Sequence, residues 1–362
     1  MVNQGLKGIT VAQTMISEVD GENGRLSYRG YDVMKLINCY SFEDVAFLIW
    51  TGSFPTEEQS RQLLSQLHTH RQLTKKSKEL IQLLPNDLDM MSVIRTVISA
   101  NGSKHYTWKP SLEQAITLTA MIPSIITYRF HRIQGTDCLE PKKELGHVAN
   151  YLYMLKGEEQ EQAIVKALET YMILTMEHSF NASTFSARVT ASTEADIVSA
   201  VTAAISTMKG PLHGGAPTGV LQLIADIQTK ERAETVIRGK VQSGEKLMGF
   251  GHRIYRTHDP RSLALREVLK SSVNQNQALD LAIAVEEAAV KVLEEEKPGR
   301  KLYTNVEFYA AAIMNALELD ASLFSPTFTA SRIVGWTAHV LEQAEHNVIY
   351  RPKAEYVGKK ME

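Results

Sequence analysis

The chain has 362 residues, of which 44% are hydrophobic and 22% are charged, so it can bury a large core and is neither disordered nor fibrous. Its 39 lysines and arginines nearly balance 41 aspartates and glutamates, and the formal charge of -2 argues against nucleic acid or an anionic membrane as a partner of the whole surface. Two cysteines are too few for a disulfide framework, a four-cysteine zinc site or an iron–sulfur cluster, which favours a reducing, cytoplasmic location.

The amino-terminal residues contain no apolar stretch of signal-peptide length, and a run of about 18 apolar residues occurs nowhere in the chain. We therefore expect a soluble protein with no membrane-spanning segment. At roughly 150 residues per domain, the length predicts about two domains.

Residues 8–30 alternate between apolar and polar side chains around Gly21 and Gly24, which predicts a small β hairpin near the start. From residue 41 onward, helical periodicity dominates. The first helix is predicted between Ser41, a typical N-cap, and Gly52, a typical stop.

Further helical patterns follow along the chain, in residues 87–102, 114–133, 161–178, 194–210, 279–296, 307–319 and 331–346. Pro123 is expected to kink or divide the second of these. Convincing strands are scarce outside the first 30 residues. The sequence therefore predicts an all-α fold of about 14 or more helices with a minor β element.

Two segments are candidate linkers: the glycine- and proline-rich run at 209–217, and residues 320–326 between two helical patterns. If both are boundaries, residues 216–320 form a small helical domain inserted into a large one of residues 1–215 and 321–362. Ligands are favoured at the interface of such domains.

Several known signatures are incomplete. Gly239 and Gly244 have P-loop spacing, but Glu245 stands at the lysine position, and Ile254 replaces the third glycine of a dinucleotide fingerprint at 249–254. Neither a G-x-S-x-G nor an H-E-x-x-H pattern occurs. These absences argue against an NTPase, a dehydrogenase, a serine hydrolase and a zincin.

Chemistry-bearing residues gather in five short segments: His178 with Asn181 three residues on, expected on one helical face; His213 among glycines ahead of a helix; residues 249–261, with His252 and several cations; Glu307 at the start of an apolar helix; and Arg332, expected to open the last long helix, with Arg351 after it. Each histidine taken alone is typical of a structural residue. Together, the set suits proton abstraction next to a carbonyl, with neutral histidines stabilising the oxygens and arginines holding a dianionic acid.

The runs GPLHGG, GFGHRIYRTHDPR, NVEFY, SRIVGW and YRPK, in this order, resemble the citrate synthase family. Upstream, GLKGI, GRLSYRGYD and SFEDVAFLIWTGSFP resemble the family's amino-terminal region, so the likeness covers essentially the whole chain. The length is similar to that of the short bacterial form, which lacks the extra amino-terminal domain of the larger NADH-regulated type.

This resemblance implies a helical homodimer whose large and small domains close over oxaloacetate and acetyl-CoA, with no metal and no further cofactor. It implies that His213 stabilises the enol, that His252 contacts the oxaloacetate carbonyl, and that the residue at the position of Glu307 removes the proton. Oxaloacetate binding falls to His178, Arg261, Arg332 and Arg351, the last supplied across the dimer, and coenzyme A contacts to Arg256 and, more weakly, Lys301. The product would be citrate in the tricarboxylic acid cycle, or 2-methylcitrate if propionyl-CoA is the substrate.

One departure falls on the chemistry, because Glu307 stands where the family has its catalytic aspartate. The extra methylene moves the carboxylate by roughly 1 Å, and a misplacement of that order can cost about 100-fold in rate. We expect the surroundings to have adjusted. Two alternatives remain: a metal-dependent hydrolase with His178, His213, His252 and Glu307 as ligands, and a low-activity or regulatory paralogue.

Overall fold

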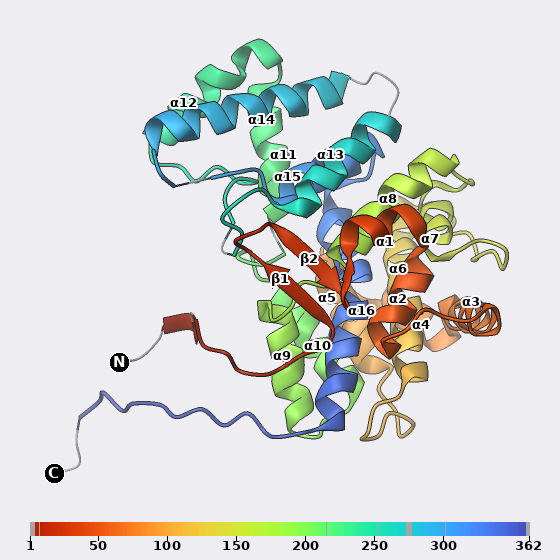
Figure 1. The fold of residues 1–362 in the computed structure, drawn as a ribbon. Helices are drawn as coiled ribbons and strands as arrows, with labels where there is room; N and C mark the ends of the chain where they lie inside the picture. Colours follow the sequence, from red (N-terminus) through yellow and green to blue (C-terminus); the bar gives the residue numbers. More distant parts are fainter. Residues whose placement is uncertain are drawn as a thin grey trace.

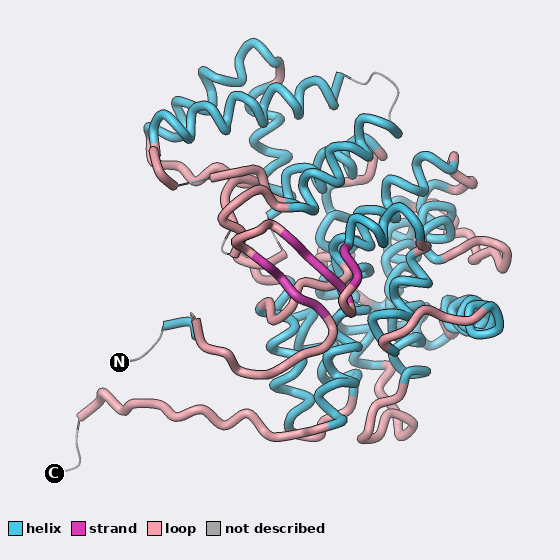
Figure 2. Tube along the Cα trace, in the orientation of Figure 1, coloured by secondary structure: helices cyan, strands magenta, loops and turns pink. Residues whose placement is uncertain are grey.

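The computed structural model describes residues 4–6, 8–214, 216–252, 254–272, 277–300 and 302–359. Within these ranges the protein is built almost entirely from helices, with one small sheet near the amino terminus (Figures 1 and 2). The predicted all-α class is therefore confirmed.

The sheet has three antiparallel strands in the order β1-β2-β3: β1 (Ser17–Asp20), β2 (Arg25–Tyr28) and β3 (Tyr31–Asp32). Its register pairs Ser17 with Tyr28 and Asp20 with Arg25. The predicted hairpin is confirmed, and it is extended by a third strand whose two residues are too few to give a pattern in the sequence.

Capping side chains define the first helices, α1 (Val33–Cys39) and α2 (Phe42–Thr51). Ser41 forms a capping box with Asp44 at the start of α2, and Gly52 ends that helix with φ of 87°. Both predicted ends of this helix are confirmed.

A large body of helices surrounds α16 (Phe324–Glu345), which is buried along most of its length and packs against α2, α6, α8, α9 and α10 (Figure 1). The other members of this body are α3 (Glu57–Arg71), α4 (Lys75–Leu83), α5 (Met90–Ala100), α6 (Leu112–Gln134), α7 (His147–Lys156), α8 (Gln162–Thr175), α9 (Ala182–Ser192) and α10 (Ile197–Met208). Short 3-10 turns lie at Gln4–Leu6, Lys230–Arg232 and Ala321–Leu323.

A second group of helices lies together at the top of Figure 1. It comprises α11 (Ala216–Ile227), α12 (Ala233–Gln242), α13 (Pro260–Ser272), α14 (Gln277–Glu296) and α15 (Val306–Ala316). Within this group α12 packs on α14, and α13 and α11 pack on α15; α13 and α15 also contact α8 of the large body. The boundary between the two groups therefore lies next to α8, α13 and α15.

Two prolines in segments that were expected to interrupt helices are instead accommodated within them. α6 runs through Pro123 as one element, so the expected division is wrong. Residues 320–326 are not a simple linker either, because a 3-10 turn leads directly into α16 and Pro326 lies in its first turn. A proline is tolerated there since the first N–H groups of a helix have no partner within it.

The carboxyl-terminal residues 347–359 form no helix or strand; Asn347 and Tyr350 still hydrogen-bond Ser192 at the end of α9, and the chain beyond them extends away from the body (Figures 1 and 2). Val348, Ile349, Tyr356 and Val357 are exposed along this segment. Separately, no helix in the described ranges is both long enough and apolar enough to cross a bilayer.

Candidate active site

Backbone pairing brings two distant motifs side by side. The Gly251 N–H donates to the Tyr303 carbonyl over 2.7 Å, and the Asn305 N–H donates to the Gly249 carbonyl over 2.9 Å. The Asn305 side chain also donates to the Gly251 carbonyl. The glycine-rich run before His252 is thereby fixed against the segment that leads into α15.

The ring of His252 is held in one tautomer by the backbone. Its Nδ1 accepts hydrogen bonds from the N–H groups of Ile254 and Tyr255, both at 3.1 Å. In the neutral ring the proton must then be on Nε2. Burial, helped by the charge of Arg261, lowers the pKa of His252 to about 4, so at neutral pH it is an uncharged hydrogen-bond donor.

His178 lies next to this ring. Its Nε2 is 3.2 Å from the Tyr255 hydroxyl, and its ring centroid is 5.6 Å from that of His252. Burial first, and then nearby arginines, hold its pKa well below the ordinary value. The expectation that His178 and Asn181 share a helical face is wrong: His178 is in the loop between α8 and α9, and Asn181 is the N-cap of α9.

Asp259 connects an arginine of the site to the helix that carries Glu307. Its carboxylate accepts from Nε and Nη2 of Arg261, at 3.0 and 2.8 Å, and from the Val306 N–H at the start of α15, at 3.1 Å. Arg261 Nη2 lies 3.5 Å from His252 Nε2, and because both nitrogens carry protons in this tautomer, the contact is not a hydrogen bond. Sequence reasoning assigned no role to Asp259, although its place two residues before Arg261 was a usable signal.

Glu307 is the second residue of α15. The side chain of Asn305 caps this helix, because its Oδ1 accepts the backbone N–H of Glu307 at 3.0 Å. This confirms the predicted position at a helix start. Burial raises the pKa of Glu307 to about 7, against the opposing charges of Arg261 and Arg332. A carboxylate with this pKa is a stronger base than an exposed glutamate and is about half ionised at pH 7.

His213 lies in the turn between α10 and α11, and its Nε2 is 2.7 Å from the Ser183 hydroxyl. Trp336 donates to the same hydroxyl oxygen from its indole N–H, at 2.9 Å. The single Ser183 hydroxyl proton can go either to Asn181 Oδ1, at 2.8 Å, or to His213 Nε2; in the second arrangement Nδ1 carries the ring proton and can donate it to a ligand. Burial, assisted by Arg332, lowers the pKa of His213 to about 4, so this ring is neutral too.

Arg332 is only 2% exposed, and its charge affects several of the groups described above. Its Nε donates to the Thr175 carbonyl over 2.6 Å, and its guanidinium lies 4.8 Å from the centre of the Phe328 ring. Its positive charge lowers the pKa of His178, His213 and Glu307, so all three lie within electrostatic range of it. The expectation that Arg332 opens the last helix is wrong, because α16 begins at Phe324 and Arg332 lies in its interior.

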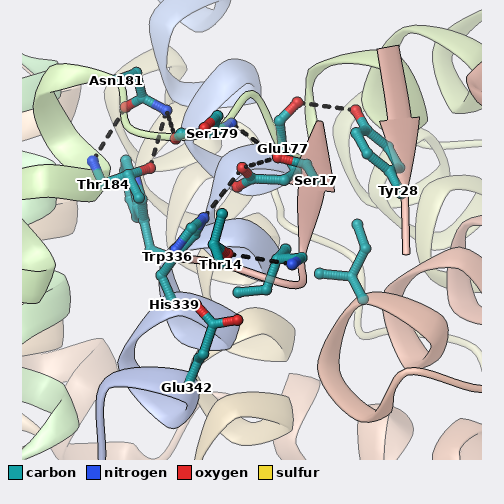
Figure 3. A network of polar contacts seen from close by, with 12 residues as sticks. Thr14, Ser17, Tyr28, Glu177, Ser179, Asn181, Thr184, Trp336, His339 and Glu342 are labelled. Atoms are coloured by element: carbon teal, nitrogen blue, oxygen red, sulfur yellow. Dashed lines mark hydrogen bonds and ion pairs between the residues drawn. The ribbon is translucent and has the colours of Figure 1, made fainter. Parts of the chain in front are cut away.

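A buried polar network supports the loop of His178 from behind (Figure 3). The Glu177 carboxylate accepts from the Ser17 hydroxyl at 2.9 Å and faces His339 Nε2 at 3.1 Å, and the Tyr28 hydroxyl donates to the Glu177 carbonyl. Although burial opposes it, His339 and Arg332 hold the pKa of Glu177 below its ordinary value. The loop is thus tied to the sheet and to α16.

Two predicted residues lie outside this cluster within one chain, and a third cannot be placed. Arg256 is exposed, with Nε 4.0 Å from Glu22. Arg351 is exposed on the carboxyl-terminal segment, where it donates to the Pro352 carbonyl. Lys301 lies outside the described residues.

Arg300 and Leu302 line a cavity of about 290 Å³, whose other charged lining residues are Lys246 and Lys297 as cations and Glu245 as an anion. Three cations against one anion make this cavity a candidate site for a negatively charged ligand.

The chemistry-bearing side chains of the site are not arranged as metal ligands. Within the described ranges, no group of three or more histidine, cysteine, aspartate or glutamate side chains could hold a metal ion. His178, His213, His252 and Glu307 thus do not form such a group in the described part of the chain.

The site and fold together define a helical protein that presents neutral histidines, a high-pKa carboxylate and buried arginines at one place. Residues 5–353 match the family described as citrate synthase, C-terminal domain. The chain therefore belongs to the citrate synthase family.

Relatives with two different names are similarly close. The citrate synthase of Haloferax volcanii is 36% identical over 99% of this chain and 96% of its own. The 2-methylcitrate synthase of Shewanella oneidensis is 38% identical over 99% and 95%. Sequence identity to these relatives therefore leaves the acyl group undecided.

Solved structures share the whole fold. The crystal structure of citrate synthase from Thermotoga maritima has a TM-score of 0.90 at 33% identity, covering 100% of this chain and 98% of that one. Citrate synthase from Thermoplasma acidophilum, solved as a ternary complex with carboxymethyl coenzyme A and oxaloacetate, has a TM-score of 0.92 at 25% identity, covering 100% and 97%.

Proposed function

We propose that the protein is a citrate synthase, which condenses acetyl-CoA with oxaloacetate and releases citrate and coenzyme A. The observation that carries this proposal is the combination of two neutral histidines, His213 and His252, with Glu307 at a pKa of about 7 around Arg261 and Arg332. This set provides a base for a carbon acid and hydrogen-bond donors for the oxygens that become negative. A silent paralogue would have no need of it.

Oxaloacetate is a dianion, and its site is assigned to His178, Arg261 and Arg332 together with Arg351. The first three are buried and adjacent, which supports a common ligand. Arg351 is on the carboxyl-terminal segment, where it lines a different cavity together with Phe185 and Tyr350. We therefore propose a homodimer in which each subunit supplies Arg351 to its partner's site.

The chemistry begins when Glu307 takes a proton from the α-carbon of the acyl group, while His213 donates a hydrogen bond to the thioester oxygen. The enol carbon then attacks the ketone carbon of oxaloacetate, and the oxygen that becomes negative receives a proton or a strong hydrogen bond from His252 Nε2. Water finally cleaves the thioester of the citryl-CoA intermediate to give citrate and free coenzyme A. Acetyl-CoA is a substrate here, and the scheme uses neither a metal nor a further cofactor.

Coenzyme A is assigned to Arg256 and Lys301, of which Arg256 precedes α13 of the second helix group. The cavity lined by Lys246, Lys297 and Arg300 supports a phosphate-rich ligand on this side.

We propose that residues 216–320 form a small domain carrying Glu307 and the acyl-CoA site, and that residues 1–215 and 321–362 form a large domain. The two domains close over the substrates, and the enzyme acts in the cytoplasm.

A thiol-release assay tests the function directly. With oxaloacetate present, purified protein should release coenzyme A from acetyl-CoA, and a parallel assay with propionyl-CoA measures the alternative, 2-methylcitrate synthesis. An apolar pocket distinguishes one methyl group by only about 1–3 kcal/mol, so some activity on both is expected. Release with neither thioester would contradict the proposal, and a higher kcat/KM for propionyl-CoA would favour the alternative.

The pKa of Glu307 predicts how the rate depends on pH. Only the carboxylate can accept a proton, and burial raises this pKa to about 7. The kcat/KM for acetyl-CoA should therefore rise through pH 7 to a plateau, and fall about tenfold per pH unit well below it. A profile flat between about pH 5 and pH 8 would contradict this environment for Glu307.

A further inference from the structure

The turn between β1 and β2 lies against the segment that carries His252. The Gly21 carbonyl accepts the Arg256 N–H at 2.8 Å. This sheet belongs to the large helical body through Tyr28, whose hydroxyl donates to the Glu177 carbonyl and lies 3.0 Å from the Ile173 carbonyl, whereas residue 256 precedes α13 of the second helix group. The turn therefore joins the two groups of helices directly beside the site.

Gly21 approaches this segment more closely than a residue with a side chain could. A Cβ at Gly21 would lie 2.4 Å from the Ile254 carbonyl oxygen and 3.0 Å from its carbon, which are backbone atoms. Gly21 has an ordinary φ, so alanine would fit its backbone conformation. The obstacle to a side chain at Gly21 is therefore Ile254, above all its carbonyl oxygen.

The crowded peptide group is one of the two that hold His252. The Ile254 carbonyl belongs to the same planar unit as the Tyr255 N–H, which donates to His252 Nδ1 at 3.1 Å. Pushing the oxygen away from Gly21 must therefore turn the N–H that faces the imidazole. A hydrogen bond of this kind weakens steeply with angle.

Hydrogen bonds to Asp20 restrict movement of the turn backbone. Asp20 Oδ1 accepts the N–H groups of Glu22 and Asn23, at 3.1 and 3.0 Å, and its Oδ2 accepts from the Asn23 side chain at 2.7 Å. These bonds fix the backbone on the carboxyl-terminal side of Gly21. The exposed pair of Glu22 with Arg256, at 4.0 Å, adds little.

We propose that Gly21 is a positioning residue for His252: the glycine turn seats the peptide between Ile254 and Tyr255 so that His252 Nδ1 remains an acceptor and Nε2 carries the proton given to the substrate oxygen. This inference rests on the proposed condensation for its kinetic consequence. The tautomer itself is a property of the protein without substrate. The hairpin thereby acts on the chemistry although it contributes no side chain to the site.

The first test compares Gly21→Ala with Gly30→Ala. Gly30 follows β2 with φ of 83°, and a Cβ added there would meet no atom within 4 Å, so its variant strains the backbone near the sheet without touching residue 254. Gly21→Ala should lower kcat by about 10- to 100-fold with KM for oxaloacetate within about threefold. Gly30→Ala should lose thermal stability and keep kcat.

The second test observes the ring itself. In enzyme with 15N-labelled histidine, the signals of His252, assigned with His252→Gln, should show an unprotonated Nδ1 and a protonated Nε2. Gly21→Ala should convert part of the population to the other tautomer. Asp20→Ala, which only frees a partly exposed turn, provides the same comparison if Gly21→Ala does not fold, with a kcat loss of about 3- to 10-fold expected.

The outcomes separate the two proposals. A protonated Nδ1 in the unmodified enzyme, or unchanged kcat and unchanged nitrogen signals in the folded variants, would overturn the role of Gly21. If the unmodified enzyme released no coenzyme A from either thioester, the proposed function would fail, while the nitrogen spectra would still decide whether the turn sets the tautomer.

Discussion

Replacing Glu307 by glutamine should reduce kcat by about 100- to 10,000-fold, the range that general acid–base catalysis contributes. Glutamine keeps the size of the side chain and the N–H that Asn305 caps, but its amide cannot accept a proton from carbon. The KM for oxaloacetate should change little, because that substrate is assigned to the arginines. Initial rates of thiol release at saturating acetyl-CoA and varied oxaloacetate give both constants.

Glu307→Asp is the matched variant, since it keeps the carboxylate and removes one methylene. It should retain activity or raise it, depending on how fully the surroundings have adjusted to the longer side chain. If Glu307→Gln turned over as fast as the unmodified enzyme, Glu307 could not be the base. Equal losses in both variants would show that position, and not proton transfer, limits the rate.

Local signals predicted the helices well where capping residues are present. Ser41 and Gly52 mark the ends of α2 because their side-chain and φ preferences act within a few residues. Proline was a weaker guide: packing around the long buried α6 outweighs the local cost of Pro123, whereas Pro326 lies in the first turn of α16, where proline removes no hydrogen bond within the helix. The sequence predicted that Arg332 opens the last long helix, because the residues just before it look like a separate segment. In the structure those residues form the first turns of α16.

The residue types of the site could be predicted from the sequence, but the surroundings of each side chain could not. Asp259 meets the Val306 N–H across 47 positions, and Ser183 meets His213 across 30. Pairs so distant leave no periodic signal in one sequence. The pKa of Glu307 likewise depends on burial, which only the packing of α15 against its neighbours determines.

Replacing Arg332 by methionine should raise the KM for oxaloacetate by about 30- to 5000-fold, since losing one partner of a buried charge pair costs roughly 2–5 kcal/mol. Methionine fills much of the same volume beside Phe328 without the charge. Arg332 also lowers the pKa of Glu307, so its removal should move the acid limb of the rate profile to higher pH.

Arg129→Met is the control for removing a buried arginine. Arg129 is 1% exposed and donates to the carbonyls of Ile81, Leu84 and Pro85, far from the site in the chain. It should lower the melting temperature with KM and the pH profile unchanged, because lost hydrogen bonds leave those carbonyls unpaired. If Arg332→Met changed only the KM for acetyl-CoA, or left the acid limb in place, Arg332 would not be the charge that oxaloacetate and Glu307 share.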